Sequence, residues 1–189
     1  MNEQQLSRIR LYFTGLVTLI ILTLLIWQHF TDGVPSHHLF QSADYPAMSN
    51  WWGALILPTL SWVLLGRINN RILLQSTAQS QGYPSGIIIG FGCALLYGAL
   101  ISVFFAIGRS EISGIMSLGI LFIALFLKVY REECVLGYII GMSVVFGAVI
   151  PTLFGTLFAI VSALLYHIVH FIWSRASLWF MRNKNSQTG

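Results

Sequence analysis

The chain is dominated by apolar runs that have the length of membrane-spanning helices. We place six of them, at residues 11–27, 51–65, 85–107, 112–127, 135–150 and 151–173. Charged residues make up 8% of the chain, against about 25% in a typical soluble domain. So little charge cannot cover a globule with a wettable surface, but it suits a surface that faces lipid. The sequence therefore predicts an all-α membrane protein, residues 1–189, built as one six-helix transmembrane bundle.

The last two runs form one apolar stretch from Val135 to Trp173. As a single helix it would be about 58 Å long, roughly twice the thickness of a bilayer core. Gly147 and Pro151 are its local helix breakers, and proline suits the first turn of a new helix. We therefore predict a turn between residues 150 and 151. The runs 51–65, 112–127 and 135–150 are shorter than the roughly 17 residues that a span needs, so flanking residues must contribute.

The positions of the cations predict the orientation, because Lys and Arg collect on the cytoplasmic side of a membrane. With the N-terminus inside, six spans place every one of the ten Lys and Arg residues except Arg109 in the cytoplasm. Five spans would put Arg175, Arg182 and Lys184 outside as well. We therefore predict cytoplasmic N- and C-termini, and a bacterial cytoplasmic (inner) membrane as the location. The expected partner is the lipid bilayer and not nucleic acid, since no basic stripe with interleaved aromatic residues occurs.

This orientation places residues 28–50 in an extracytoplasmic loop, which is unusually long for a connection. Three histidines and two acids lie in it: His29, His37, His38, Asp32 and Asp44. A histidine beside an aspartate can serve as a general acid or base. His37, His38 and Asp44 are therefore the candidate catalytic residues, with a structural cap over the bundle as the alternative.

Four further residues are candidates for binding a substrate at the same outer face. Arg109 and Glu111 fall in the turn between the third and fourth runs, and Trp51 and Trp52 open the second run. A lone outer arginine could anchor a phosphate or carboxylate group. The sequence names no cofactor and leaves metal content unknown. A centre built from all five histidines is excluded, because His167 and His170 are expected near the cytoplasmic face.

Small residues recur at every fourth position of the third run and again in the fifth. They are Gly86, Gly90, Ala94, Gly98, Ser102 and Ala106, followed by Gly137 and Gly141. Small residues let membrane helices approach closely. The stripes therefore predict packing within the chain or, as the alternative, a seam for a homodimer or a membrane-protein partner. Cys93 and Cys134 are expected at opposite ends of the bundle, so no disulfide is predicted.

Three functions remain open on the sequence alone. The first is an accessory or assembly-type membrane protein whose outer His/Asp loop contacts a partner. The second is a membrane-embedded enzyme that acts on a lipid or lipid-linked substrate at the outer face. The third is a small transporter or channel, which the lack of a mid-span carboxylate disfavours.

Overall fold

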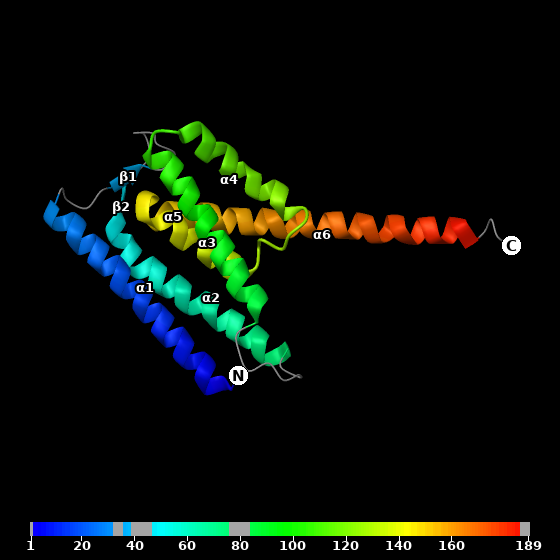
Figure 1. The fold of residues 1–189 in the computed structure, drawn as a ribbon, viewed down its shortest axis with the longest axis horizontal. Helices are drawn as coiled ribbons and strands as arrows, with labels where there is room; N and C mark the ends of the chain where they lie inside the picture. Colours follow the sequence, from blue (N-terminus) through cyan, green and yellow to red (C-terminus); the bar gives the residue numbers. More distant parts are fainter. Residues whose placement is uncertain (1, 32–35, 39–46, 76–83, 186–189) are drawn as a thin grey trace.

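The computed structural model describes residues 2–31, 36–38, 47–75 and 84–185, and these are almost entirely helical (Figure 1). The six helices are α1 (Glu3–Thr31), α2 (Gly53–Gln75), α3 (Ser85–Ala106), α4 (Ser110–Ala124), α5 (Glu132–Phe146) and α6 (Val149–Asn185). Between α1 and α2 lies an antiparallel hairpin of two short strands, β1 (Ser36–His38) and β2 (Ala47–Ser49). The short 3-10 helix η2 (Asn50–Trp52) then leads into α2.

All six helices expected from the apolar runs form. Four helical segments are long and apolar enough to cross a membrane: Glu3–Thr31, Asn50–Leu74, Ser85–Ala106 and Val149–Trp173. Helices α4 and α5 have 15 residues each, which corresponds to about 22 Å against a bilayer core of about 30 Å. The chain is thus a helical protein with four candidate membrane spans, and the crossing of α4 and α5 stays a prediction.

The predicted turn in the last apolar stretch is present, two to four residues before the expected boundary. Helix α5 ends at Phe146, Gly147 has a φ of 68°, and α6 begins at Val149 with Pro151 in its first turn. Glycine adopts positive φ without the steric cost of a side chain. A Cβ atom at Gly147 would also collide with the side-chain oxygen of Asn50. The turn is therefore fixed against the start of α2.

Helices α1 and α2 pack against each other through polar as well as apolar contacts. The Arg10 Nε donates to the carbonyl oxygen of Trp62 at 2.8 Å, and its guanidinium carbon lies 3.9 Å from the centre of the Trp62 ring system. The Asn69 Nδ2 donates to the carbonyl oxygen of Leu6 at 2.9 Å. Each polar group is satisfied by the neighbouring helix, which is what a low-dielectric environment requires.

Helices α3 and α5 make the closest contact in the molecule. A Cβ atom at Gly137 would collide with the carbonyl oxygen of Phe91, and one at Gly141 with that of Leu95. The Ser102 hydroxyl lies 3.3 Å from the carbonyl oxygen of Gly141. These residues of the small-residue stripes therefore pack within the chain, as the favoured interpretation expected. A homodimer or other membrane-protein partner stays a prediction.

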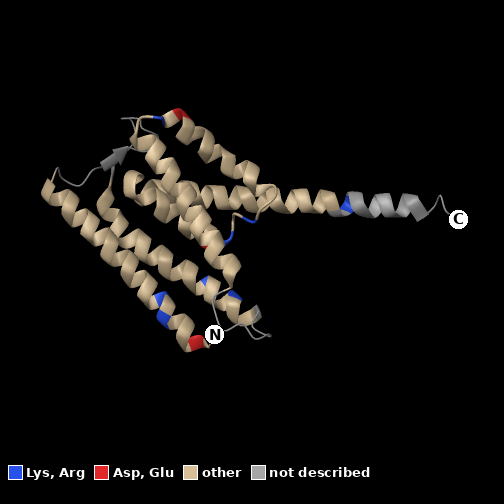
Figure 2. Cartoon of the chain, viewed as in Figure 1, with Lys and Arg blue, Asp and Glu red and all other residues tan. Residues whose placement is uncertain are grey.

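The two ends of the bundle differ in charge. The start of α1, the end of α2 and the α4–α5 connection lie toward one end of the bundle. The hairpin and the α3–α4 turn lie toward the other end (Figure 1). Lys and Arg positions gather toward the first end (Figure 2). The C-terminal part of α6 continues beyond the other helices (Figure 1).

Candidate functional site

The histidines proposed for catalysis lie in the hairpin between α1 and α2. In β1, His37 is paired with Met48 and His38 with Ala47. Asp44, the third proposed catalytic residue, lies outside the described residues. The structure therefore does not test whether these three residues lie close together, and their catalytic role stays a prediction.

The candidate binding tryptophans lie where the hairpin leads into α2. Trp51 and Trp52 form η2 and are both exposed. The Ser49 hydroxyl accepts a hydrogen bond from the Trp51 backbone N–H, so Ser49 caps this turn. The centre of the His29 ring lies 6.2 Å from that of Trp51. The end of α1 and the start of α2 are thereby brought together beside the hairpin.

Arg109 and Glu111 lie at the start of α4 and are both exposed. Within the described residues neither of them forms an ion pair, and the two do not pair with each other. The two acids of the loop between α1 and α2, Asp32 and Asp44, lie outside the described residues. The described parts of the chain also hold no cluster of three or more His, Cys, Asp or Glu residues suited to a metal ion.

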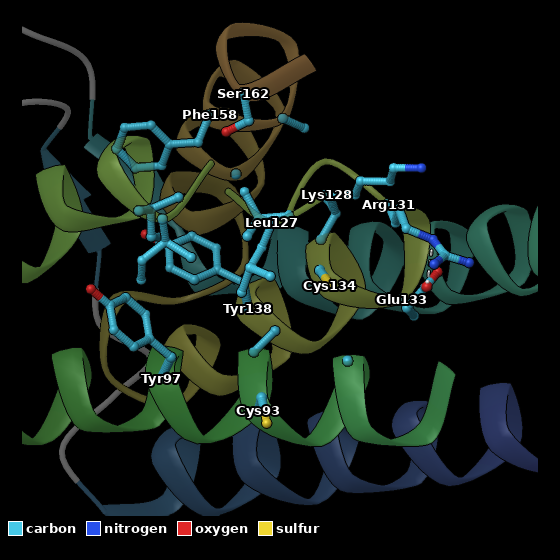
Figure 3. Close-up of a pocket in the computed structure, with 18 of the residues that line it drawn as sticks. Cys93, Tyr97, Leu127, Lys128, Arg131, Glu133, Cys134, Tyr138, Phe158 and Ser162 are labelled. Carbon is cyan, nitrogen blue, oxygen red and sulfur yellow. Dashed lines mark ion pairs between the residues drawn. The ribbon is translucent and has the colours of Figure 1, made fainter. Parts of the chain in front are cut away.

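The most distinctive concave feature lies elsewhere, between α3, α4, α5 and α6 (Figure 3). It is a cavity of about 440 Å³, within the range of roughly 300–1,000 Å³ that is usual for small-molecule sites. Its walls are mainly apolar and include Ile89, Ala94, Ile120, Ile123, Val135 and Phe158. Such a lining matches a hydrocarbon chain better than a polar metabolite.

Small side chains on α3 and α6 create the space. Gly86 and Gly90 line the cavity from α3, and Gly155 and Ala159 line it from α6. Larger groups hold the surrounding helices in place. The Tyr97 hydroxyl donates to the carbonyl oxygen of Met116 at 2.7 Å, which ties α3 to α4. The aromatic rings of Tyr138 and Phe158 meet edge to face at 6.3 Å between centres, which ties α5 to α6.

Two hydroxyls in the cavity wall, those of Ser162 and Tyr138, have no hydrogen-bond partner among the described residues. Ser162 is 0% exposed, and its Oγ is unpaired. Other buried or half-buried helix hydroxyls donate to the carbonyl four residues earlier, as Ser117, Ser143 and Thr152 do. A buried hydroxyl without a partner costs roughly 1–3 kcal/mol. Ser162 is therefore free to bond to a molecule in the cavity.

The two cysteines correct an expectation from the sequence. Cys93 of α3 and Cys134 of α5 were expected at opposite ends of the bundle, but both line this cavity (Figure 3). Both are free thiols. The expectation was wrong because Cys134 lies in the first turn of α5, which packs along α3 close to the position of Cys93.

A cluster of ion pairs borders one edge of the cavity. Glu133 is 2% exposed, and its carboxylate meets Arg71 at 2.6 Å and Arg131 at 2.9 Å. Arg71 also meets Glu132 at 2.8 Å. Figure 3 shows the Arg131 side chain reaching Glu133 at this edge. The buried carboxylate is thus neutralised by two arginines, as the cost of burying a charge demands.

A second, polar cavity of about 330 Å³ adjoins the first. Its walls are Arg71, Lys128, Tyr130, Arg131 and Glu132, so Lys128 and Arg131 line both cavities. Nearby, the Lys128 ammonium lies 5.4 Å from the centre of the Tyr166 ring. The Tyr166 hydroxyl in turn lies 3.0 Å from the Nε2 of His170. The three cations at this edge, Lys128, Arg131 and Arg71, are here called the cationic mouth. Aromatic side chains flank the cationic mouth.

Sequence reasoning missed this site. Its signals were present as Glu132 and Glu133 beside Arg131, and as glycines on α3 and α6, but nothing in the sequence showed that these segments meet. Comparison with protein-family models, with curated proteins and with solved structures finds no match. The function must therefore be argued from the geometry itself.

Proposed function

We propose that this chain is an accessory-type integral membrane protein that binds a membrane lipid, holding one hydrocarbon chain in the cavity between α3, α4, α5 and α6. The observation that carries the proposal is the apolar cavity of about 440 Å³ with a charged edge. Apolar walls with a few placed polar groups are the usual form of a site for an amphiphilic ligand.

Binding is favoured over catalysis by the chemistry of the lining. Activation of a nucleophile needs a base within hydrogen-bond reach. The Ser162 hydroxyl has no such partner among the described residues. The carboxylate of Glu133 is held by two arginines, and none of the described histidines lines the cavity. The described groups can therefore hold a lipid but lack an arrangement that would cleave one.

The proposal includes six crossings of a bacterial cytoplasmic membrane, with both termini in the cytoplasm. Its support is the gathering of Lys and Arg toward one end of the bundle (Figure 2), which is the pattern of a cytoplasmic face. The 15-residue helices α4 and α5 then cross with help from the residues that flank them. A short span is accommodated by local thinning of the bilayer at a modest cost per ångström.

Lipid retention by the purified full-length protein tests the binding proposal. Ala159 lines the cavity, whereas Leu157 lies on the same helix, is 53% exposed and does not line it. Ala159→Trp should fill the cavity and remove co-purified lipid in native mass spectrometry, while Leu157→Trp should retain it. Equal lipid on both variants, or none on the unchanged protein, would contradict the proposal. Thermal unfolding in detergent checks that both variants remain folded.

Thiol labelling of intact cells tests the six crossings. In a background of Cys93→Ala and Cys134→Ala, a single cysteine at Ser110 should react with a membrane-impermeant maleimide from outside. A single cysteine at Val129, in the α4–α5 connection, should react only after the cells are opened. External labelling of both positions would show that α4 does not cross the membrane, and external labelling of position 129 alone would show the opposite orientation.

A further inference from the structure

The structure points to the class of lipid. We propose that the occupant is an anionic glycerophospholipid whose phosphate binds Lys128 and Arg131 at the cationic mouth while one acyl chain fills the apolar cavity. This inference rests on the proposed function and deepens it. Three observations carry it: the charge balance at the mouth, the lining residues that the two cavities share and the unpaired hydroxyl of Ser162.

The charge balance leaves one cation free for a ligand. Arg71, Lys128 and Arg131 face two carboxylates, those of Glu132 and Glu133. Both carboxylates are engaged by Arg71, and Glu133 also by Arg131. Within the described residues Lys128 has no carboxylate partner. A net positive charge of one at the mouth favours an anion over a neutral headgroup.

The two cavities together have the shape of an amphiphile. The apolar cavity of about 440 Å³ and the polar cavity of about 330 Å³ have Lys128 and Arg131 as their shared lining residues. A molecule that occupied both would place hydrocarbon on one side of these cations and a polar group on the other. A phosphate between them could accept charge-assisted hydrogen bonds from the Lys128 ammonium and the Arg131 guanidinium.

Ser162 distinguishes a glycerolipid from a plain hydrocarbon chain. Its hydroxyl is fully buried in the cavity wall and has no partner among the described residues. A glycerophospholipid carries ester carbonyls between its phosphate and its acyl chains. One of these carbonyl oxygens would accept a hydrogen bond from the Ser162 hydroxyl. A ligand with an all-carbon chain would leave the hydroxyl unsatisfied at a cost. The site is therefore matched to an ester-linked lipid.

Headgroup selectivity of the purified, delipidated full-length protein tests the inference. The probes are phosphatidylglycerol and phosphatidylcholine with identical acyl chains, added in equal amounts in mild detergent and quantified by native mass spectrometry. We expect phosphatidylglycerol to be bound in excess by about tenfold, because the choline cation of phosphatidylcholine would bring a further positive charge to a mouth that is already net positive. Lys128→Ala should remove that excess, while Lys128→Arg should keep it.

Two further variants complete the design. Arg8→Ala removes an exposed cation of α1 that does not line either cavity, so it should bind both lipids as the unchanged protein does. Ser162→Ala should weaken the binding of both ester lipids by several-fold and leave their ratio unchanged. Millimolar inorganic phosphate should not displace phosphatidylglycerol, because it lacks the acyl chain. Displacement by phosphate would assign the mouth to free phosphate instead.

The outcomes separate this inference from the proposed function. If both lipids bind equally to the unchanged protein and Ala159→Trp abolishes both, the cavity binds lipid but the assignment of an anionic headgroup is wrong. If neither lipid binds, the proposed function itself fails. If Lys128→Ala keeps the full preference for phosphatidylglycerol, the phosphate does not bind where the inference places it. Lys128 is exposed, so its replacement should not prevent folding.

Discussion

Helix α3 uses small residues on two faces with opposite results. On one face the backbone of α3 touches that of α5, so that Gly137 and Gly141 admit no side chain. On the other face Gly86 borders an open cavity of about 440 Å³, and a Cβ atom added there would meet no described atom within 4 Å outside the backbone of its own helix. A small residue thus produces close packing or empty space according to what stands opposite it.

The difference arises from the partner helices. Helix α5 presents its own glycines to α3, so two flat surfaces meet and both gain dispersion contacts. Helix α6 also has two small residues at this site, Gly155 and Ala159. However, its Phe158 packs on Tyr138 of α5 and lies in the space between α5 and α6. The cavity is therefore a consequence of mixed large and small residues on α5 and α6, not of α3 alone.

Removal of the buried carboxylate at the cavity edge should have the largest effect. Glu133→Ala leaves Arg131 without its acid and Arg71 with Glu132 alone, and the loss of two hydrogen bonds between charged groups costs about 3 kcal/mol. We expect a marked fall in the detergent unfolding temperature and loss of bound lipid. Glu132→Ala is the matched control, because Glu132 is more exposed and bonds to Arg71 alone. Equal losses in the two variants would show that burial of Glu133 does not matter.

The face of α3 that packs against α5 is tested by adding one methyl group. Gly141→Ala places a Cβ atom against the carbonyl oxygen of Leu95, and overpacking of this kind costs roughly 1–3 kcal/mol. Thermal unfolding in detergent should show the loss. An unchanged unfolding temperature would mean that α3 and α5 do not pack as closely as described.

Gly92 of α3 lies neither on the face that packs against α5 nor on the face that borders the cavity. Its replacement by alanine should raise the stability of the protein instead of lowering it. A Cβ atom added at Gly92 would meet no described atom within 4 Å outside the backbone of its own helix, and Gly92 does not line the cavity. Gly92→Ala should therefore stabilise the helix by roughly 0.5–1 kcal/mol, because alanine loses less backbone entropy than glycine. Thermal unfolding in detergent measures the gain. Destabilisation would reveal a contact at this position, such as one with a second copy of the chain.

The hairpin should contribute least to the bundle. His37→Ala/His38→Ala changes residues of β1, which pairs only with β2 among the described elements. We expect a change in stability within about 0.5 kcal/mol and unchanged lipid retention. If the outer loop is instead catalytic, the same double variant should abolish the phenotype at unchanged abundance in cells. Loss of folded protein would favour a structural cap.

Much of the helical organisation could be predicted from single residues and their periodicity. Each of the six apolar runs corresponds to a helix. The break near Gly147 and Pro151 follows from the backbone preferences of glycine and proline. The helix ends were less predictable. Helix α1 continues to Thr31, inside the expected loop, and α6 continues to Asn185. A hydropathy pattern marks where a helix is apolar and not where its hydrogen bonds end.

The sequence drew attention to a different kind of feature from the cavity. His37, His38 and Asp44 were chosen because ionisable residues stood out in an apolar chain. The cavity is made instead by residues that do not stand out, such as Ala159 and Ser162. Its charged edge joins Arg71 to Glu132 and Glu133, about 60 residues further along the chain. Such long-range pairs leave no local pattern, so hydropathy and motif analysis cannot find them.

The sequence by itself determined the helical class, the six helices, the turn before α6 and the segregation of cations at helix ends. These properties depend on local backbone preference and on the free energy of transfer from water to lipid, which are additive along a chain. Only the tertiary structure decided that α3 packs on α5, that Cys93 and Cys134 share one cavity, and that Glu133 is buried between two arginines. Those features depend on which helix faces which, and side-chain shape at the contact sets that choice.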